Sequence, residues 1–156
     1  AMASNIPQPD DLTPADTWSP HIEQREIPFE FVPAEKRDGS GQLMSWYRVK
    51  ENFGDDQLMH RCALAYLSDD LPTGAVIRGV PELRERWNQE NAFFSASLDH
   101  TIWFHRDIDS SQWHLYEMNC HAYINGRGLA FGYVFAQDGT HVATVAQETL
   151  VRLREQ

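Results

Sequence analysis

The chain has 156 residues, of which 42% are hydrophobic and 12% aromatic, so it is long enough for one globular domain with its own core. Thirteen basic and twenty-three acidic residues give a formal net charge of −10, which excludes nucleic acid and anionic membrane surfaces as favoured partners. There is no uncharged apolar run long enough for a membrane span, so no membrane insertion is expected. Two cysteines, Cys62 and Cys120, are too few for a disulfide framework and favour an intracellular compartment.

The first twenty residues are expected to be a linker or a cloning remnant, with a single domain over residues 21–156. Residues 4–20 are rich in Pro, Asp and Thr and have no apolar period. Alternating apolar residues at 27, 29 and 31 then predict a strand over 22–32. A second strand over 43–50 follows a glycine-containing turn at 37–41, which is typical of a hairpin.

One long helix is predicted over residues 57–68, with Asp55 or Asp56 as its N-cap. His60 and Arg61 mark the side expected to face water. The side expected to be buried carries apolar residues at helical spacing, namely Leu58, Met59, Cys62, Ala63, Tyr66 and Leu67. A second, short helix is expected to begin at Pro81.

The remaining sequence predicts long antiparallel strands. They are expected over 97–106, 114–124, 129–136 and 141–153, and an Asp-Gly turn at 138–139 joins the last two as a hairpin. The fold class is therefore α+β. One long central helix wrapped by an antiparallel sheet is the packing that this inventory favours, and the hotdog fold has that architecture.

Two polar residues stand out within these apolar strands. Asp99 is a candidate general base, because burial can tune the pKa of a carboxylate in such a setting; a solvent-facing or turn-capping aspartate is the alternative. Gln147 lies in the most apolar strand, over 142–150, where a buried amide needs hydrogen-bond partners or a ligand. The alternative for Gln147 is an edge or surface position.

The histidines and cysteines offer weaker candidates. His100 and His105 are five residues apart and would lie on opposite faces of one strand, so no metal site is predicted. Cys120 and His121 are adjacent and should also point to opposite faces. A core-facing cysteine and an ordinary histidine are therefore favoured over a thiol activated by a base.

Phosphate-binding candidates are Arg106 and Arg127, since guanidinium groups bind phosphate well. Arg127 belongs to an Asn-Gly-Arg-Gly turn in which the two glycines, Gly126 and Gly128, could let the backbone approach a ligand or another strand. Asn125 and Gly126 of this turn are candidate substrate contacts together with the arginines. A solvated arginine at the end of a strand is the alternative for both arginines.

Taken in order, four motifs resemble the C-terminal half of the acyl-CoA thioesterase II (TesB-like) family. They are the runs SLDHTIWFHR at 97–106, WHLYEM at 113–118, NGRGLAFG at 125–132 and VATVAQE at 142–148. The resemblance covers residues 21 to 153 and includes the predicted helix.

That resemblance implies a double-hotdog enzyme that hydrolyses acyl-CoA to free acid and CoA without a metal or cofactor. An aspartate, a glutamine and a threonine or serine of the C-terminal half would hold the attacking water. By motif position the aspartate is Asp99 and the glutamine is Gln147. His121 stands at the position of the hydroxyl residue.

The chain departs from the family pattern in two ways. Residues 119–124 read NCHAYI where the family has a hydroxyl-rich run, which could impair or redirect the activity. The resemblance also covers one hotdog rather than two, so we expect a homodimer or pairing with an N-terminal hotdog half.

Two alternatives to hydrolysis remain open. One is a non-catalytic hotdog that binds acyl groups or serves as a scaffold, and the other is an enoyl-thioester hydratase or dehydratase using His121. The compartment is left open between cytoplasm and peroxisome.

Overall fold

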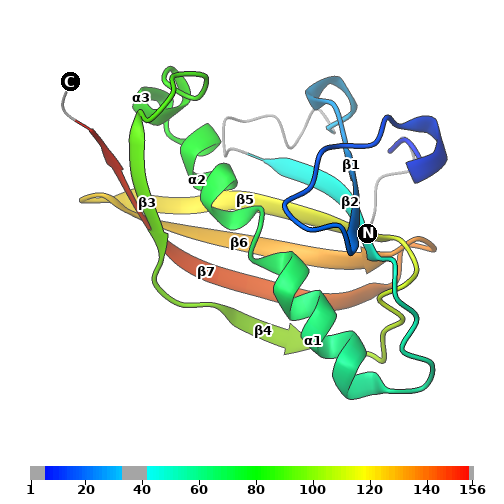
Figure 1. Cartoon of the computed structure of the whole chain (residues 1–156). Coiled ribbons are helices and arrows are strands. Elements are labelled where there is room, and N and C mark those ends of the chain that lie inside the picture. Colours follow the sequence, from blue (N-terminus) through cyan, green and yellow to red (C-terminus); the bar gives the residue numbers. More distant parts are fainter. Residues whose placement is uncertain (1–5, 33–41, 155–156) are drawn as a thin grey trace.

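The computed structural model describes residues 6–32 and 42–154 (Figure 1). These residues form a seven-stranded antiparallel sheet in the order β1-β2-β5-β6-β7-β3, with β4 also pairing with β7. The strands are β1 Ile22–Glu26, β2 Leu43–Val49, β3 Phe93–Ser97, β4 Thr101–Phe104, β5 His114–Ile124, β6 Arg127–Ala136 and β7 His141–Leu153. The helices are α1 Gln57–Ser68, α2 Pro72–Gly79 and α3 Pro81–Arg84, and two 3-10 turns lie at Pro9–Asp11 and Phe29–Phe31. In the described part of the chain, no helix has the length and apolar character needed to cross a membrane.

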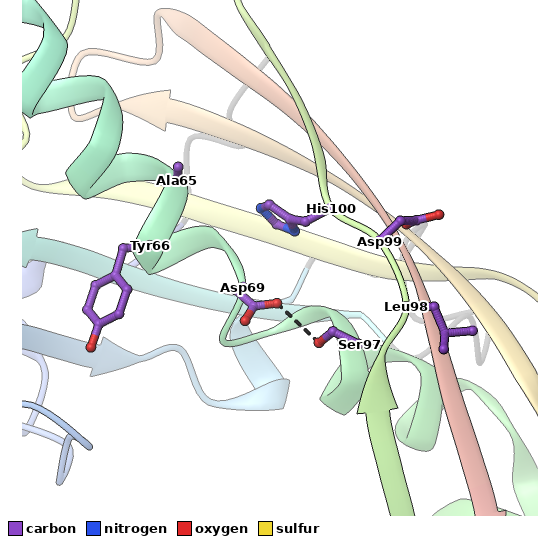
Figure 2. Close-up of a pocket in the computed structure, with 7 residues that line it drawn as sticks. All are labelled: Ala65, Tyr66, Asp69, Ser97, Leu98, Asp99 and His100. Atoms are coloured by element: carbon purple, nitrogen blue, oxygen red, sulfur yellow. Dashed lines mark hydrogen bonds between the residues drawn. The ribbon is translucent and has the colours of Figure 1, made fainter.

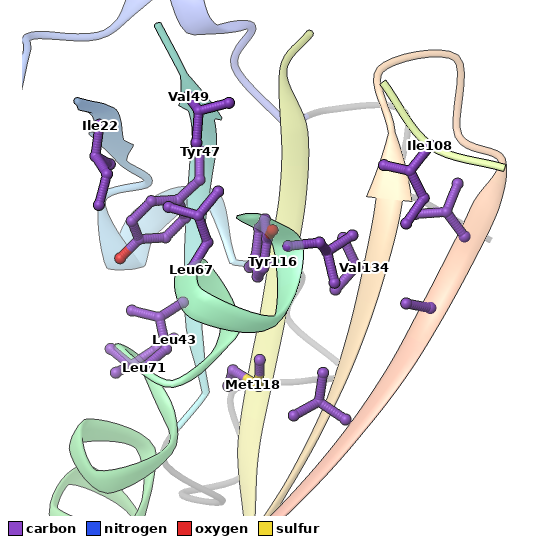
Figure 3. Close-up of a cluster of buried hydrophobic side chains, with 14 of the residues drawn as sticks. Ile22, Leu43, Tyr47, Val49, Leu67, Leu71, Ile108, Tyr116, Met118 and Val134 are labelled. Carbon is purple, nitrogen blue, oxygen red and sulfur yellow. The ribbon is translucent and has the colours of Figure 1, made fainter. Parts of the chain in front are cut away.

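Helices α1 and α2 follow one another across one face of the sheet (Figure 1). The predicted bounds of α1 are confirmed, and Asp56 is its N-cap, accepting hydrogen bonds from the backbone amides of Leu58 and Met59 at 3.1 Å each. The main core lies between these helices and the sheet, where Leu64 and Leu67 of α1 pack against strand residues such as Tyr116 (Figure 3). The α+β class and the central helix are thereby confirmed.

The predicted buried side of α1 is wrong for most of its residues, although Leu67 is buried as predicted. Leu58, Met59 and Tyr66 are 71%, 43% and 56% exposed, whereas His60, expected to face water, is buried. His60 reaches Ser110 Oγ at 3.0 Å and the Gly54 carbonyl at 2.9 Å, so its polar atoms are satisfied inside the protein. The buried stripe is instead His60, Leu64, Leu67 and Ser68. The exposed apolar residues Leu58, Met59 and Tyr66 form a second stripe, the uncovered stripe of α1.

Two predicted strands are shorter than expected. The strand over 22–32 ends at Glu26 because Pro28 cannot donate to a ladder, and Phe29–Phe31 form a 3-10 turn instead. The pairing of β1 with β2 is antiparallel, as predicted, while the predicted turn at 37–41 lies outside the described residues. The strand over 97–106 is divided into β3 and β4 by residues 98–100. The short helix at Pro81 is confirmed, but α2 was not predicted.

A second core lies on the opposite face of the sheet. Met44 and Trp46 point there, while their neighbours Leu43 and Tyr47 point to the helices, as the period of two requires. Residues from the expected linker take part in this core. Ile6 is buried in it, and the indole Nε1 of Trp46 donates to the Pro7 carbonyl at 2.9 Å.

Candidate functional site

A pocket of about 360 Å³ opens where β3 gives way to β4, beside the C-terminal end of α1 (Figure 2). Its lining residues are Ala65, Tyr66, Asp69, Ser97, Leu98, Asp99 and His100. Ser97 pairs with Thr149 and Thr101 with Ala146, so three residues of this segment face only two of β7. One extra residue disrupts a ladder locally and re-aims side chains, as a β-bulge does. The pocket therefore exists because the predicted continuous strand is interrupted.

Asp99 occupies the middle of this interruption. Its Oδ1 accepts a hydrogen bond from the backbone amide of Glu148 at 2.7 Å, so the carboxylate replaces a ladder carbonyl. The side chain is exposed and points away from His100 (Figure 2). Its second oxygen, Oδ2, has no hydrogen-bond partner within residues 6–32 and 42–154. Asp99 is thus fixed at one oxygen and open at the other.

Gln147 lies on the other face of β7 and is fully buried. Its Oε1 contacts the imidazole Nδ1 of His100, and its Nε2 donates to Ser97 Oγ at 2.8 Å. The remaining ring nitrogen of His100, Nε2, lies 2.8 Å from Ser68 Oγ. The Ser97 hydroxyl donates to Asp69 Oδ1 at 3.3 Å. Gln147 is therefore held in a polar network between α1 and β7, and the alternative of a surface position is wrong.

Asp99 and Gln147 are brought to the same stretch of β7, but they do not bind each other. Asp99 holds the backbone of Glu148, which is adjacent to Gln147 in the chain. Successive side chains of a strand point to opposite faces, and Gln147 faces the helices with Val145 and Thr149. Asp99 lines the pocket, while Gln147 lies behind its wall.

His121 lies on β5, at a register shift between Cys120 and Ala122. It is exposed and packs edge-on against Phe131, with ring centroids 5.3 Å apart. Cys120 pairs with Ala130, which pairs with Gln147, so His121 is about two strand spacings, roughly 10 Å, from β7. The described structure gives it no contact with Asp99 or Gln147.

Cys120 itself is half-buried and packs against a small apolar cluster. Burial raises the pKa of its thiol, which disfavours the reactive thiolate form. This environment agrees with the core-facing cysteine favoured from the sequence.

The four candidate phosphate-binding residues do not form one site. Asn125 and Gly126 make the two-residue turn between β5 and β6, with φ values of +52° and +81°, a conformation that favours asparagine and glycine. Arg127 faces Glu148, with 3.4 Å between Nε and Oε1, and Arg106 donates to the His141 carbonyl. Leu150, the partner of Arg127, and His141 are nine residues apart on β7, which corresponds to roughly 30 Å.

Sequence reasoning missed Ser68, Asp69, Ser97 and His100 as members of the site. The signal available was Gln147 itself, because a buried amide in an apolar strand requires polar partners. The described residues contain no group of three or more His, Cys, Asp or Glu side chains able to hold a metal ion.

Comparison with known proteins first identifies the fold and then the family. A protein of unknown function from Alicyclobacillus acidocaldarius, described as having a hot dog fold, superposes with a TM-score of 0.66 at 19% identity, over 99% of this chain and 56% of that one. The predicted hotdog fold is therefore confirmed. The family model described as the acyl-CoA thioesterase C-terminal domain matches residues 3–151. The chain belongs to that family.

Two relatives show how much of a longer protein the chain corresponds to. The acyl-CoA thioesterase II TesB2 of Mycobacterium marinum is 34% identical with a TM-score of 0.80, over 96% of this chain and 55% of that one. Acyl-CoA thioesterase 2 of Haemophilus influenzae is 36% identical over 71% of this chain and 37% of its own length. The chain thus spans about half or less of the length of these relatives.

Proposed function

We propose that the chain hydrolyses an acyl-CoA thioester to a free acid and CoA, using water activated by Asp99. The observation that carries this proposal is the carboxylate at the pocket, held at Oδ1 by the Glu148 amide and open at Oδ2. Water is a poor nucleophile unless a positioned base removes its proton during attack. Membership of the acyl-CoA thioesterase family supports the thioester as substrate.

In this mechanism Asp99 Oδ2 accepts the proton of the attacking water. The bond from water oxygen to the acyl carbon forms, and the bond from that carbon to sulfur breaks. A thiolate is a good leaving group and needs little acid assistance. Gln147 has two amide hydrogens, and Ser97 Oγ is the acceptor found for them among the described residues. Because Gln147 is buried behind the pocket wall, its second N–H polarises the carbonyl or orients the water only when Ser97 or His100 moves to open that wall.

We further propose that a second hotdog domain completes the site, as a second copy of this chain or an N-terminal half. Strand β4 pairs with β7 alone among the described strands, and Trp103 and Phe104 on it are 49% and 38% exposed. The uncovered stripe of α1 lies beside this edge (Figure 1). An unpaired strand edge next to apolar surface favours association.

The charge of the pocket supports the same conclusion. Its lining residues include the carboxylates Asp69 and Asp99 and no lysine or arginine. CoA is a polyanion, so its phosphates need cations from outside this lining. A partner domain could supply them, and it would also deepen the pocket.

The experiment is a thiol-release assay with acyl-CoAs of short to long chain, together with the mass of the particle in solution by light scattering. The matched control is Asp99→Asn, which keeps an Oδ1 acceptor for the Glu148 amide and removes the base. Release by the unmodified chain that the control lacks supports hydrolysis. Release no greater than that of Asp99→Asn, with binding of a non-hydrolysable acyl-CoA analogue, would select the non-catalytic alternative.

A further inference from the structure

His100 stands between the pocket and the buried amide of Gln147. It lines the pocket and is half-buried, whereas Gln147 is fully buried and is absent from the lining. Its Nδ1 contacts Gln147 Oε1 on β7, and its Nε2 lies 2.8 Å from Ser68 Oγ on α1. The ring therefore ties the helix to the residue proposed to polarise the thioester.

The hydrogen bonds around His100 run in one direction. With a proton on Nδ1 the ring donates to Gln147 Oε1, and its Nε2 lies 2.8 Å from Ser68 Oγ. The Ser68 hydroxyl donates to the Ala65 carbonyl at 2.9 Å. The Gln147 amide then donates to Ser97 at 2.8 Å, and Ser97 donates to Asp69 at 3.3 Å.

This chain of donors selects one orientation of the Gln147 amide. The oxygen and nitrogen ends of a glutamine have nearly the same shape, so neighbouring donors and acceptors decide which way they point. A donor at His100 Nδ1 fixes the oxygen end, and the N–H end then faces Ser97 at the pocket wall.

We propose that His100 is a positioning residue for thioester hydrolysis, acting through the amide of Gln147. This inference rests on the proposed function. The site would lose its oriented N–H donor when the imidazole is removed, even though Asp99 keeps its own bond to Glu148.

The kinetic test compares His100→Leu, His100→Asn, Gln147→Leu and the double variant His100→Leu/Gln147→Leu in the full chain. Mutation of the outer-shell partners of metal ligands typically costs about 10- to 100-fold, and we expect a loss of similar size in kcat for His100→Leu with KM nearly unchanged. Asparagine places an amide N–H where Nδ1 stands, so His100→Asn should restore most of kcat. The double variant should be no slower than Gln147→Leu alone.

A purely structural histidine would give other results. In that case His100→Leu would lower thermal stability without changing kcat of the folded protein. Alternatively, the fold-losses in kcat of His100→Leu and Gln147→Leu would multiply in the double variant. Either result overturns the proposal. His21→Leu is the matched control, because His21 is exposed, contacts Glu51 and is not among the residues that line the pocket.

A second measurement does not depend on turnover. The side-chain amide signals of Gln147 are observed by NMR in a ¹⁵N-labelled sample, and they are assigned as the signals that disappear in Gln147→Leu. They should shift and exchange faster with solvent in His100→Leu, and stay in place in His21→Leu. Unchanged signals in His100→Leu overturn the positioning role. If the chain releases no thiol, the proposed function fails, and these signals alone still decide whether His100 positions the amide.

Discussion

Asp99 and Glu148 are joined by a hydrogen bond of 2.7 Å between a side-chain oxygen and a backbone amide, at the point where the ladder between β7 and its neighbour is interrupted. The bond serves two purposes at once. It satisfies an N–H that would otherwise lose its acceptor, and it fixes the carboxylate proposed as the general base. Structure and chemistry at this residue can therefore be separated by mutation.

Asp99→Asn and Asp99→Ala should differ in stability and agree in activity. Asparagine keeps an oxygen for the Glu148 amide, whereas alanine removes it and should lower the free energy of unfolding by about 1 kcal/mol, the usual worth of one hydrogen bond. Both variants should lose thiol release by about 10²- to 10⁴-fold, as expected for a missing general base. Urea unfolding and the thiol assay on the same samples check this, and full activity of either variant would contradict the role of the carboxylate.

The stability of the fold should fall as the pH is lowered through the histidine range, in part because of His114. Burial of this residue lowers the pKa of its imidazole below 6.5, although a hydrogen bond to the Gln112 carbonyl opposes the shift. The unfolded chain then binds a proton more readily than the folded one, so the contribution is complete above pH 6.5 and is lost as the pH falls toward the folded pKa. His114→Gln should flatten the dependence of the urea midpoint on pH between 7.5 and 5.5. An identical slope in both proteins would contradict this origin.

The contact between β6 and α2 leaves no room for a side chain at Gly128. A Cβ there would lie 2.3 Å from Val76 Cγ1 and 2.7 Å from Cγ2, and valine is stiff about χ1. Gly128→Ala should lower the free energy of unfolding by about 1–3 kcal/mol, the usual cost of overpacking. Val76→Ala made in the same chain should recover part of that loss, which a double-mutant cycle by chemical unfolding measures. Gly54 is the control for backbone strain, since its φ is +59° and a Cβ there meets nothing within 4 Å.

Local patterns in the sequence predicted the helix and most of the strands. The N-cap at Asp56 and the turn at Asp138-Gly139 depend on interactions over a few residues, so a local sequence pattern is enough to predict them. The interruption at residues 98–100 could not be read in this way. It depends on the register of β7, to which β3 and β4 both pair, and register is a tertiary property.

Tertiary contacts also decide which side of α1 is buried. Leu58 and His60 lie two residues apart, and hydropathy alone puts the leucine inside. The structure buries His60 because two groups outside the helix form hydrogen bonds with its ring. One is the hydroxyl of Ser110, which is distant in the sequence, and the other is the carbonyl of Gly54, in the loop before the helix. For the site, the family resemblance named Asp99 and Gln147, and the structure brings both to one stretch of β7. His100 was weighed only as a metal ligand, although its side chain reaches Gln147 and points away from that of Asp99.

The uncovered stripe of α1 makes a last prediction about Cys62. This cysteine is exposed and lies on the same face of the helix as Leu58 and Tyr66, whereas Cys120 is half-buried with a raised thiol pKa. Cys62 should therefore react first with a thiol reagent in dilute protein, because the thiolate is the reactive form and must be reached by solvent. If the proposed partner domain covers this stripe, labelling of Cys62 should slow as protein concentration rises and the particle mass doubles. Cys120→Ser provides a chain with Cys62 as its one thiol, in which the rate can be followed directly. A labelling rate independent of concentration, in a sample whose mass does double, would place the interface away from α1.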